Sequence, residues 1–217
     1  DAFLIVIALL AQLVAGLIWR SKLPQWLPGL YLLLMVLVIL QAGLGALTVL
    51  KLLPSVVVMA HLALALVLLA LMSALSQYLL SGNFLTIPVW WRFFAGGTVT
   101  AVIVQSLLGS RVATSWAFQR CLALGEVCEL LDLHRNTAKP VAIFVLAFVI
   151  ISLLIGDWFR RQWPFFVAIA VLLVTQVCLG ILAVHVGLVE PVVTVGHQLV
   201  AALLVAFLAA LSCKSPK

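Results

Sequence analysis

Long runs of apolar residues, separated by short polar segments, extend along the whole chain. The apolar positions are continuous rather than alternating, which favours membrane-spanning helices over the strands of a β-barrel. The first and fifth runs are short for the ~20 residues that a span needs, so their ends must be extended or partly interfacial. The pattern predicts an all-α polytopic membrane protein with seven transmembrane helices, at Ala2–Trp19, Leu30–Leu50, Val56–Leu80, Phe93–Ser110, Val141–Gly156, Phe165–Val186 and Val192–Ser212.

The composition excludes a soluble globular protein, because 66% of the 217 residues are hydrophobic and only 8% are charged. The net charge of +6 is not gathered into a patch, so it does not indicate nucleic-acid binding. Basic residues are somewhat more numerous in the loops after the first, third and fifth spans and in the C-terminal tail, which predicts that these segments are cytoplasmic. The long loop after the fourth span then lies on the non-cytoplasmic side.

A motif of the form Q-x-x-L-G occurs three times, at Gln41, Gln105 and Gln176, each time late in a predicted span. His61 follows the first copy after 20 residues, and His197 follows the third after 21. The second and third spans therefore match the sixth and seventh. These correspondences predict a pseudo-repeat of two four-helix bundles, of which the first is truncated.

The repeat also sets the expected domain limits. These are an incomplete N-terminal half-bundle at 1–80, a cytoplasmic linker at 81–92 and a C-terminal four-helix bundle at 93–213. Aligning Arg20 with Arg160 places Asp1 opposite Val141, and His134 stands seven residues before Val141. We therefore expect the gene to encode a further span, an outer loop and a histidine upstream of Asp1.

Three histidines, His61, His134 and His197, are expected at about the same depth below the outer surface. Imidazole is costly in hydrocarbon unless it has a partner, so each needs an explanation. A hydrogen bond between helices would explain one isolated histidine, but matched positions in a repeat favour a cofactor. Heme ligated by two histidines within a helical bundle is the natural choice. His134 and His197 would form one pair, and His61 would pair with the upstream histidine.

Two neighbouring residues have weaker assignments. Arg135 is expected near a heme propionate, because a guanidinium binds carboxylates bidentately; the alternative is an interfacial arginine that extends to the lipid headgroups. His185 has no histidine at the equivalent position of the repeat, where Leu50 stands. It is interpreted as interfacial, with a role at the heme edge as the alternative.

The four cysteines fall into two classes. Cys121 and Cys128 lie in the outer loop, where oxidation is permitted, and six intervening residues make a disulfide feasible but not necessary. Zinc is disfavoured because no second pair of cysteines or histidines is nearby. Cys178 and Cys213 are interpreted as buried apolar residues within or at the end of spans. The segment Trp116–Leu133 is expected to form a short helix lying on the membrane.

The order and spacing of these features resemble heme A synthases. The resemblance rests on the repeated Q-x-x-L-G, on the cysteine pair before an H-R helix, and on one histidine that opens the last helix of each unit. The run "GALTVLKLLPSVVVMAH", which ends at His61, looks particularly like the family's third-to-fourth helix region. The resemblance covers essentially the whole chain, as helices two to eight of an eight-helix protein.

This resemblance implies a function and a set of sites. His134 and His197 would hold a permanent heme b, and His61 would belong to the site that binds the substrate, heme O. The family oxidises a methyl group of heme O to a formyl group, which gives heme A for terminal oxidases. The resemblance also implies a location in a bacterial plasma membrane or an organelle inner membrane. Besides the lipid bilayer, the implied partners are heme O synthase, a terminal oxidase or a larger membrane complex.

The sequence departs from the family pattern in its N-terminal part. The family's first cysteine pair, its first histidine and a glutamate three residues before that histidine, thought to be catalytic, are absent from this sequence. In the second unit the position equivalent to that glutamate is Leu131, so Glu129 and Asp132 do not inherit its role. The catalytic residues therefore stay unassigned.

Two other functions are compatible with the same residues. One is a heme-b membrane cytochrome that transfers electrons without synthase activity. The other is a structural membrane subunit without heme, whose histidines only join helices. A reduced-minus-oxidised spectrum separates the structural subunit from the two heme proteins, and conversion of heme O to heme A separates the synthase from the cytochrome.

We expect Cys121 and Cys128 to form a disulfide in the oxidised protein. Closing this short loop should stabilise it by roughly 2–3 kcal/mol through loss of conformational entropy in the unfolded chain. Mass spectrometry of the protein after non-reducing extraction with thiol blocking measures the bond directly. Recovery of both cysteines as blocked thiols would contradict the prediction.

Overall fold

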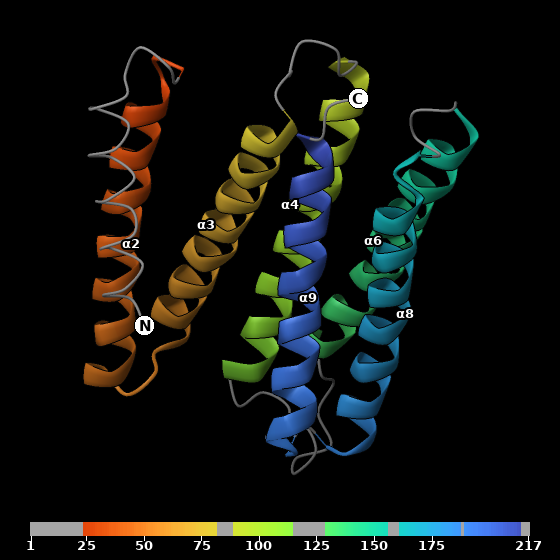
Figure 1. Ribbon diagram of the computed structural model, residues 1–217. Helices are drawn as coiled ribbons and strands as arrows, with labels where there is room; N and C mark the ends of the chain where they lie inside the picture. The colour runs from red at the N-terminus through yellow and green to blue at the C-terminus, as the bar shows by residue number, and fades with distance from the viewer. Residues whose placement is uncertain (1–23, 82–88, 115–128, 156–160, 188, 214–217) are drawn as a thin grey trace. The chain divides into compact units, whose positions relative to one another are not determined.

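The computed structural model describes residues 24–81, 89–114, 129–155, 161–187 and 189–213, and these form six helices with no strand (Figure 1). Each helix is long and apolar enough to cross a membrane. The prediction of an all-α membrane protein is confirmed for these residues; the expected first span, 2–19, lies outside them. The helices are α2 (Leu27–Leu50), α3 (Ser55–Ser81), α4 (Val89–Thr114), α6 (Glu129–Leu154), α8 (Trp163–His185) and α9 (Pro191–Ser212).

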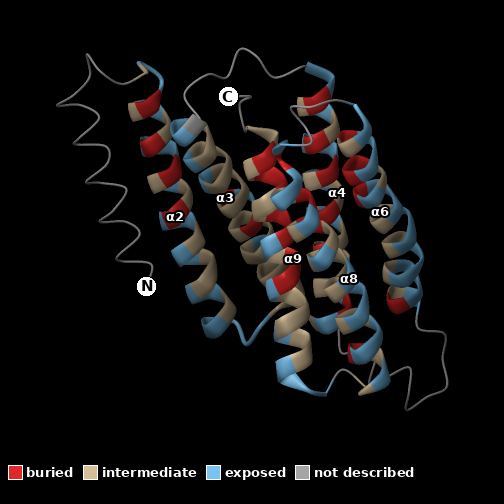
Figure 2. Ribbon diagram, turned by 45° about the vertical axis from the view of Figure 1, so that its right-hand side comes forward, coloured by how far each residue is buried: buried red, intermediate tan, exposed pale blue. Residues whose placement is uncertain are grey.

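The outer faces of the helices are apolar. Large hydrophobic side chains are exposed on all six, including Ile39 of α2, Phe93 of α4 and Val192 of α9. Figure 2 shows the buried residues on the sides of α4, α6, α8 and α9 that face neighbouring helices, and exposed residues on the other sides. Water would penalise so much exposed apolar surface, whereas lipid tails accept it. The described helices therefore fit an integral membrane protein.

Helix α6 differs most from its sequence-based prediction. It begins at Glu129, twelve residues before the expected start at Val141, and it continues through Pro140. The expected membrane-surface helix is therefore wrong for its last five residues, which belong to α6, and its remainder lies outside the described residues. The charged residues of this first part are all exposed and recur at helical spacing, namely Glu129, Asp132, Arg135 and Lys139. They form a polar stripe on the part of the helix that precedes its apolar run.

The chain divides into two compact units, residues 1–68 and residues 69–217. In the second unit, called here the C-terminal unit, α4 packs on α6, α6 on α8, α8 on α9 and α9 on α4. This closed order places α6 and α9 on one diagonal of a four-helix bundle. The later part of α3 belongs to the same unit, and there the Ser73 hydroxyl donates a hydrogen bond to the carbonyl of Ala206 at 2.9 Å. The domain limits expected from the repeat stay a prediction.

Two tight turns join helices within the units. Residues 51–54 join α2 to α3, and Leu52 and Leu53 have positive φ angles of 55° and 60°. Residues 186–190 join α8 to α9, and here Gly187 takes the left-handed conformation, with φ 70°. A left-handed residue after a helix satisfies the last carbonyl groups and reverses the chain. Both turns thus form helical hairpins.

One end of the C-terminal bundle is filled by aromatic rings. Phe148 of α6 is fully buried, with its ring centroid 4.6 Å from that of Trp91 and 5.1 Å from that of Phe94, both on α4. Phe166 of α8 adds an edge contact to Trp91 at 6.2 Å. Leu208 of α9 is also fully buried. All four helices therefore contribute large side chains, and this end is densely packed.

Replacing Phe148 with alanine should lower the free energy of unfolding by about 3–5 kcal/mol, because it leaves a cavity between two buried aromatic rings. Phe93 on the same bundle is 78% exposed, and Phe93→Ala should change stability by no more than about 0.5 kcal/mol. Reversible unfolding in mixed micelles compares the two variants. Equal losses would show that the aromatic cluster does not hold this end of the bundle together.

Candidate functional site

His134 lies in the first turns of α6, where Gln105 of α4 holds it by two contacts. The Gln105 amide Nε2 donates to the backbone carbonyl of His134 at 2.7 Å and lies 3.0 Å from its ring nitrogen Nδ1. One turn further along α4, a Cβ at Gly109 would lie only 2.9 Å from Cε1 of the same ring. The imidazole therefore rests against the backbone of α4, between the glutamine and the glycine of one Q-x-x-L-G motif.

His197 of α9 has the same surroundings on the other side of the bundle. Nε2 of Gln176, on α8, lies 3.2 Å from Nε2 of the His197 ring. A Cβ at Gly180 would lie 3.1 Å from Cε1 of that ring. The third Q-x-x-L-G motif thus holds His197 between a glutamine and a glycine, as the second holds His134, but it contacts Nε2 of the ring instead of Nδ1.

The two histidines lie at the same end of the C-terminal bundle, on helices that are diagonal to each other. His134 follows the first residue of α6, Glu129, by five residues, and His197 follows the first residue of α9, Pro191, by six. Both histidines are therefore near the start of their helices. This is the end opposite the aromatic cluster, so one bundle has a densely packed end and an end that contains two imidazoles.

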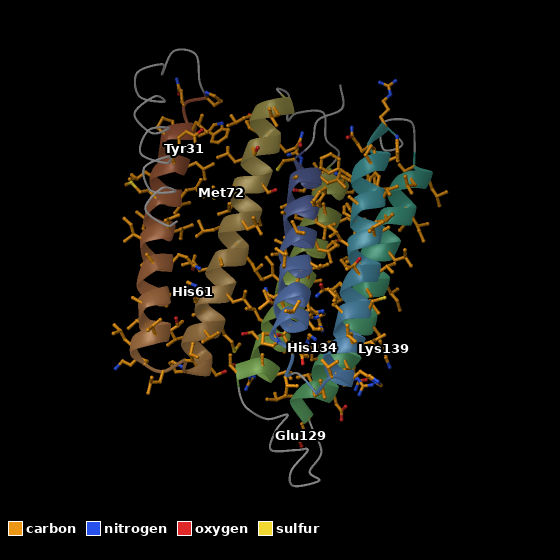
Figure 3. All side chains as sticks on the ribbon, turned by 60° about the horizontal axis from the view of Figure 1, so that its bottom comes forward. Tyr31, His61, Met72, Glu129, His134 and Lys139 are labelled. Atoms are coloured by element: carbon orange, nitrogen blue, oxygen red, sulfur yellow. The ribbon has the colours of Figure 1, made fainter. Side chains whose placement is uncertain are left out.

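His61 has an equivalent environment in the unit formed by residues 1–68. Nε2 of Gln41, on α2, lies 3.3 Å from Nε2 of the His61 ring, and a Cβ at Gly45 would lie 3.1 Å from its Cε1. Figure 3 shows His61 on α3, on the side of that helix that faces α2. The first motif therefore holds His61 by the same two contacts, and all three predicted histidines have one Q-x-x-L-G partner each.

Comparison with protein-family models matches residues 2–209 to COX15-CtaA, the cytochrome oxidase assembly protein family. The chain belongs to this family. Comparisons with curated proteins and with solved structures give no significant match. The family match confirms the resemblance to heme A synthases, and it connects the chain to cytochrome oxidase assembly through heme A synthesis.

The histidines of this cytochrome oxidase assembly protein fit a heme. Nδ1 of His197 and Nδ1 of His61 are buried and have no hydrogen-bond partner, so each ring keeps one nitrogen for a further ligand. The glutamine contacts His134 through Nδ1, which leaves its Nε2. Two neutral imidazoles from opposite helices are a suitable pair of axial ligands for heme iron. Among the described residues no group of three or more histidine, cysteine or acidic side chains could hold a bare metal ion.

The acidic residues that the structure describes on α6 lie on its exposed face. Leu131, one turn before His134, is buried against Val112 of α4, so an apolar contact occupies the position equivalent to the family's glutamate. Glu129 and Asp132 are exposed. In Figure 3, Glu129 lies at the extreme end of α6, beyond His134. Neither of these two carboxylates is therefore held in the interior of the bundle.

The other predicted residues occupy more peripheral places. Arg135 is exposed next to His134, and His185 is exposed as the last residue of α8, so neither is held in the bundle interior. Cys121 and Cys128 lie outside the described residues. Cys178 is an exposed free cysteine, which makes the prediction that it is buried wrong, because its position on α8 faces outward from the bundle; Cys213 is partly buried.

The sequence did not reveal what the Q-x-x-L-G motif does. It marked the repeat, but the contacts between its glutamine and the histidine of the following helix appear only in the structure. The signal was present in the spacing, because positions i and i+4 share one face of a helix. A glutamine and a glycine on that face leave room for a ring and provide a hydrogen-bond partner for it.

Proposed function

We propose that this protein is a heme A synthase that holds a heme b between His134 and His197 and binds its substrate, heme O, at the His61 site. The observation that carries the proposal is the pair of imidazoles on diagonal helices of one bundle, each with one nitrogen held by a glutamine. Membership of the cytochrome oxidase assembly family supports the reaction class.

The chain's own residues have distinct tasks in this proposal. His134 and His197 bind a heme from both sides, and the aromatic cluster around Phe148 keeps water from the other end of the bundle. A bis-histidine heme supplies one-electron oxidation and reduction and has no open position for substrate. Arg135 is available at the outer end of α6 for a propionate. The distribution of basic residues between the loops supports a long loop on the non-cytoplasmic side.

The substrate site belongs to the other unit. His61 has the same glutamine and glycine neighbours as the two heme b ligands, which supports a role as a ligand for a heme-like molecule. Conversion of the methyl to a formyl group removes four electrons and four protons and takes one oxygen atom from water. A heme held by the histidine pair would carry these electrons one at a time to an external electron acceptor. His61 therefore binds and orients heme O, and the histidine pair serves electron transfer.

Removing either heme b ligand should strip the C-terminal heme. His134→Ala and His197→Ala each delete an axial bond, so heme content per chain should fall strongly and the α-band of the reduced spectrum should disappear or shift. His61→Ala should keep this heme, because His61 is in the other unit, and His185→Ala should cause only small spectral shifts. Heme b at wild-type level in both His134→Ala and His197→Ala would refute the assignment.

The synthase reaction is tested by pigment analysis. The full-length gene product, expressed with a heme O synthase in a host without its own heme A synthase, should produce heme A that chromatography of extracted hemes detects. His61→Ala should abolish heme A and leave heme b bound, since it removes only the substrate ligand. His185→Ala serves as the matched control and should produce heme A normally. Bound heme b without any heme A in the wild-type strain would instead favour the cytochrome.

A further inference from the structure

We propose that the Q-x-x-L-G motif is the device that orients each histidine for heme, with its glutamine as a positioning residue that tunes the bound heme. This inference rests on the proposed function, because it assigns roles to neighbours of the proposed ligands. It concerns Gln41, Gln105 and Gln176 and the glycine four residues after each of them.

The same arrangement occurs three times, on three different pairs of helices. In every copy the glutamine Nε2 lies 3.0–3.3 Å from a ring nitrogen of one histidine. In every copy a Cβ on the motif glycine would lie 2.9–3.1 Å from Cε1 of that ring, which is closer than real Cβ contacts come at Gly109 and tighter than most of them at Gly45 and Gly180. A recurring pair of contacts to the same residue type indicates a function of the motif rather than an accident of packing.

The glutamine amide has an unused acceptor in every copy. Oε1 of Gln41, Gln105 and Gln176 is buried and has no hydrogen-bond partner, although a buried carbonyl normally has one. The amide nitrogen now donates to a ring nitrogen that carries a free electron pair. An imidazole bound to iron through one nitrogen carries a proton on the other, so its outer nitrogen becomes a donor and needs an acceptor.

At Gln105 the amide nitrogen is also held by the backbone carbonyl of His134, so its two groups stay as they are. At Gln41 and Gln176 a half-turn of the amide about its last side-chain bond exchanges the two groups. Oε1 then occupies the place of Nε2 and accepts the hydrogen bond from the ligated ring. Glutamine can thus serve both the free and the ligated histidine, and the ligated form satisfies the acceptor that is otherwise orphaned. A hydrogen bond to the outer N–H fixes the ring and makes the imidazole a stronger ligand, as in other metal-bound histidines.

The glycine has a steric task. The ring can lie within reach of the glutamine only because the neighbouring helix has no side chain at the fourth position after it. Other glycines of the same unit have no such neighbour: a Cβ at Gly96 would meet nothing within 4 Å, and one at Gly196 would meet only Leu179, at an ordinary 3.8 Å. The close approach is therefore specific to the motif.

The decisive experiment measures the reduction potential of heme b in the full-length protein. Gln176→Leu removes the acceptor, so the imidazole donates less charge to iron, the oxidised state loses stabilisation and the potential should rise. Heme affinity should also fall, on the order of 10–100-fold. Gln176→Glu keeps an acceptor oxygen and should hold the potential at or below the wild-type value. The potential is read only from chains that retain heme, so partial misfolding does not obscure it.

Gln41→Leu is the matched control, because Gln41 contacts His61 in the other unit and should leave the heme b potential unchanged. A wild-type potential in Gln176→Leu, with heme b still lost in His134→Ala, would overturn this inference and leave the proposed function intact. A wild-type protein that binds no heme b would overturn both. A rise in Gln176→Glu equal to that in Gln176→Leu would also contradict the acceptor role.

The glycines provide an independent test. Gly109→Ala and Gly180→Ala should displace the rings and reduce heme content, whereas Gly96→Ala and Gly196→Ala should keep wild-type heme content. Membrane abundance and unfolding temperature of each heme-free chain identify variants that fail to fold. Folded Gly109→Ala and Gly180→Ala proteins with full heme and an unchanged spectrum would refute the steric role.

Discussion

The cost of placing an imidazole among apolar helices is the constraint on which the rest of this structure depends. A ring with two nitrogens requires polar partners that hydrocarbon cannot supply. Here each of His61, His134 and His197 receives one from a glutamine on an adjacent helix. Because the partner comes from another helix, the same contact that satisfies the ring also selects which helices pair.

The C-terminal bundle separates two physical requirements along its length. Its aromatic end is packed by dispersion contacts among Trp91, Phe94, Phe148 and Phe166, which give rigidity without polar groups. Its other end contains the polar atoms that a cofactor needs. The packed end joins all four helices, including α6 and α9, which carry the two imidazoles.

Much of the fold follows from hydrophobicity alone, and the departures have physical reasons. Five of the expected spans agree with helices to within about four residues at either end, because a bilayer requires long apolar helices. Helix α6 is longer than the predicted span 141–156, because the apolar run begins only at Val141 whereas the helix begins at Glu129 and continues through Pro140. The charged residues before Pro140 lie on its exposed face, and a single proline does not end a helix that neighbours support.

The site was predictable in part. The repeat identified His61, His134 and His197, since a histidine at matched positions of apolar helices is rare enough to stand out. The glutamine and glycine that contact each histidine could not be identified from the sequence, because both residue types are common in helices. Their role becomes visible only when the structure places them against an imidazole ring. The exposure of Cys178 was missed for a similar reason: a sequence shows that a residue is within a span but not which side of the helix faces the bundle.

The two hairpin turns explain why the spacing from glutamine to histidine differs by one residue between copies. His61 and His197 are each the seventh residue of their helix, and the glutamines stand equally far from the ends of α2 and α8. The additional residue therefore lies entirely in the turn 186–190, which is longer than the turn 51–54. An insertion inside a helix would instead rotate the histidine by about 100° around the helix axis and carry it away from its partner. The loops can vary in length, whereas the helical phase on either side of them cannot.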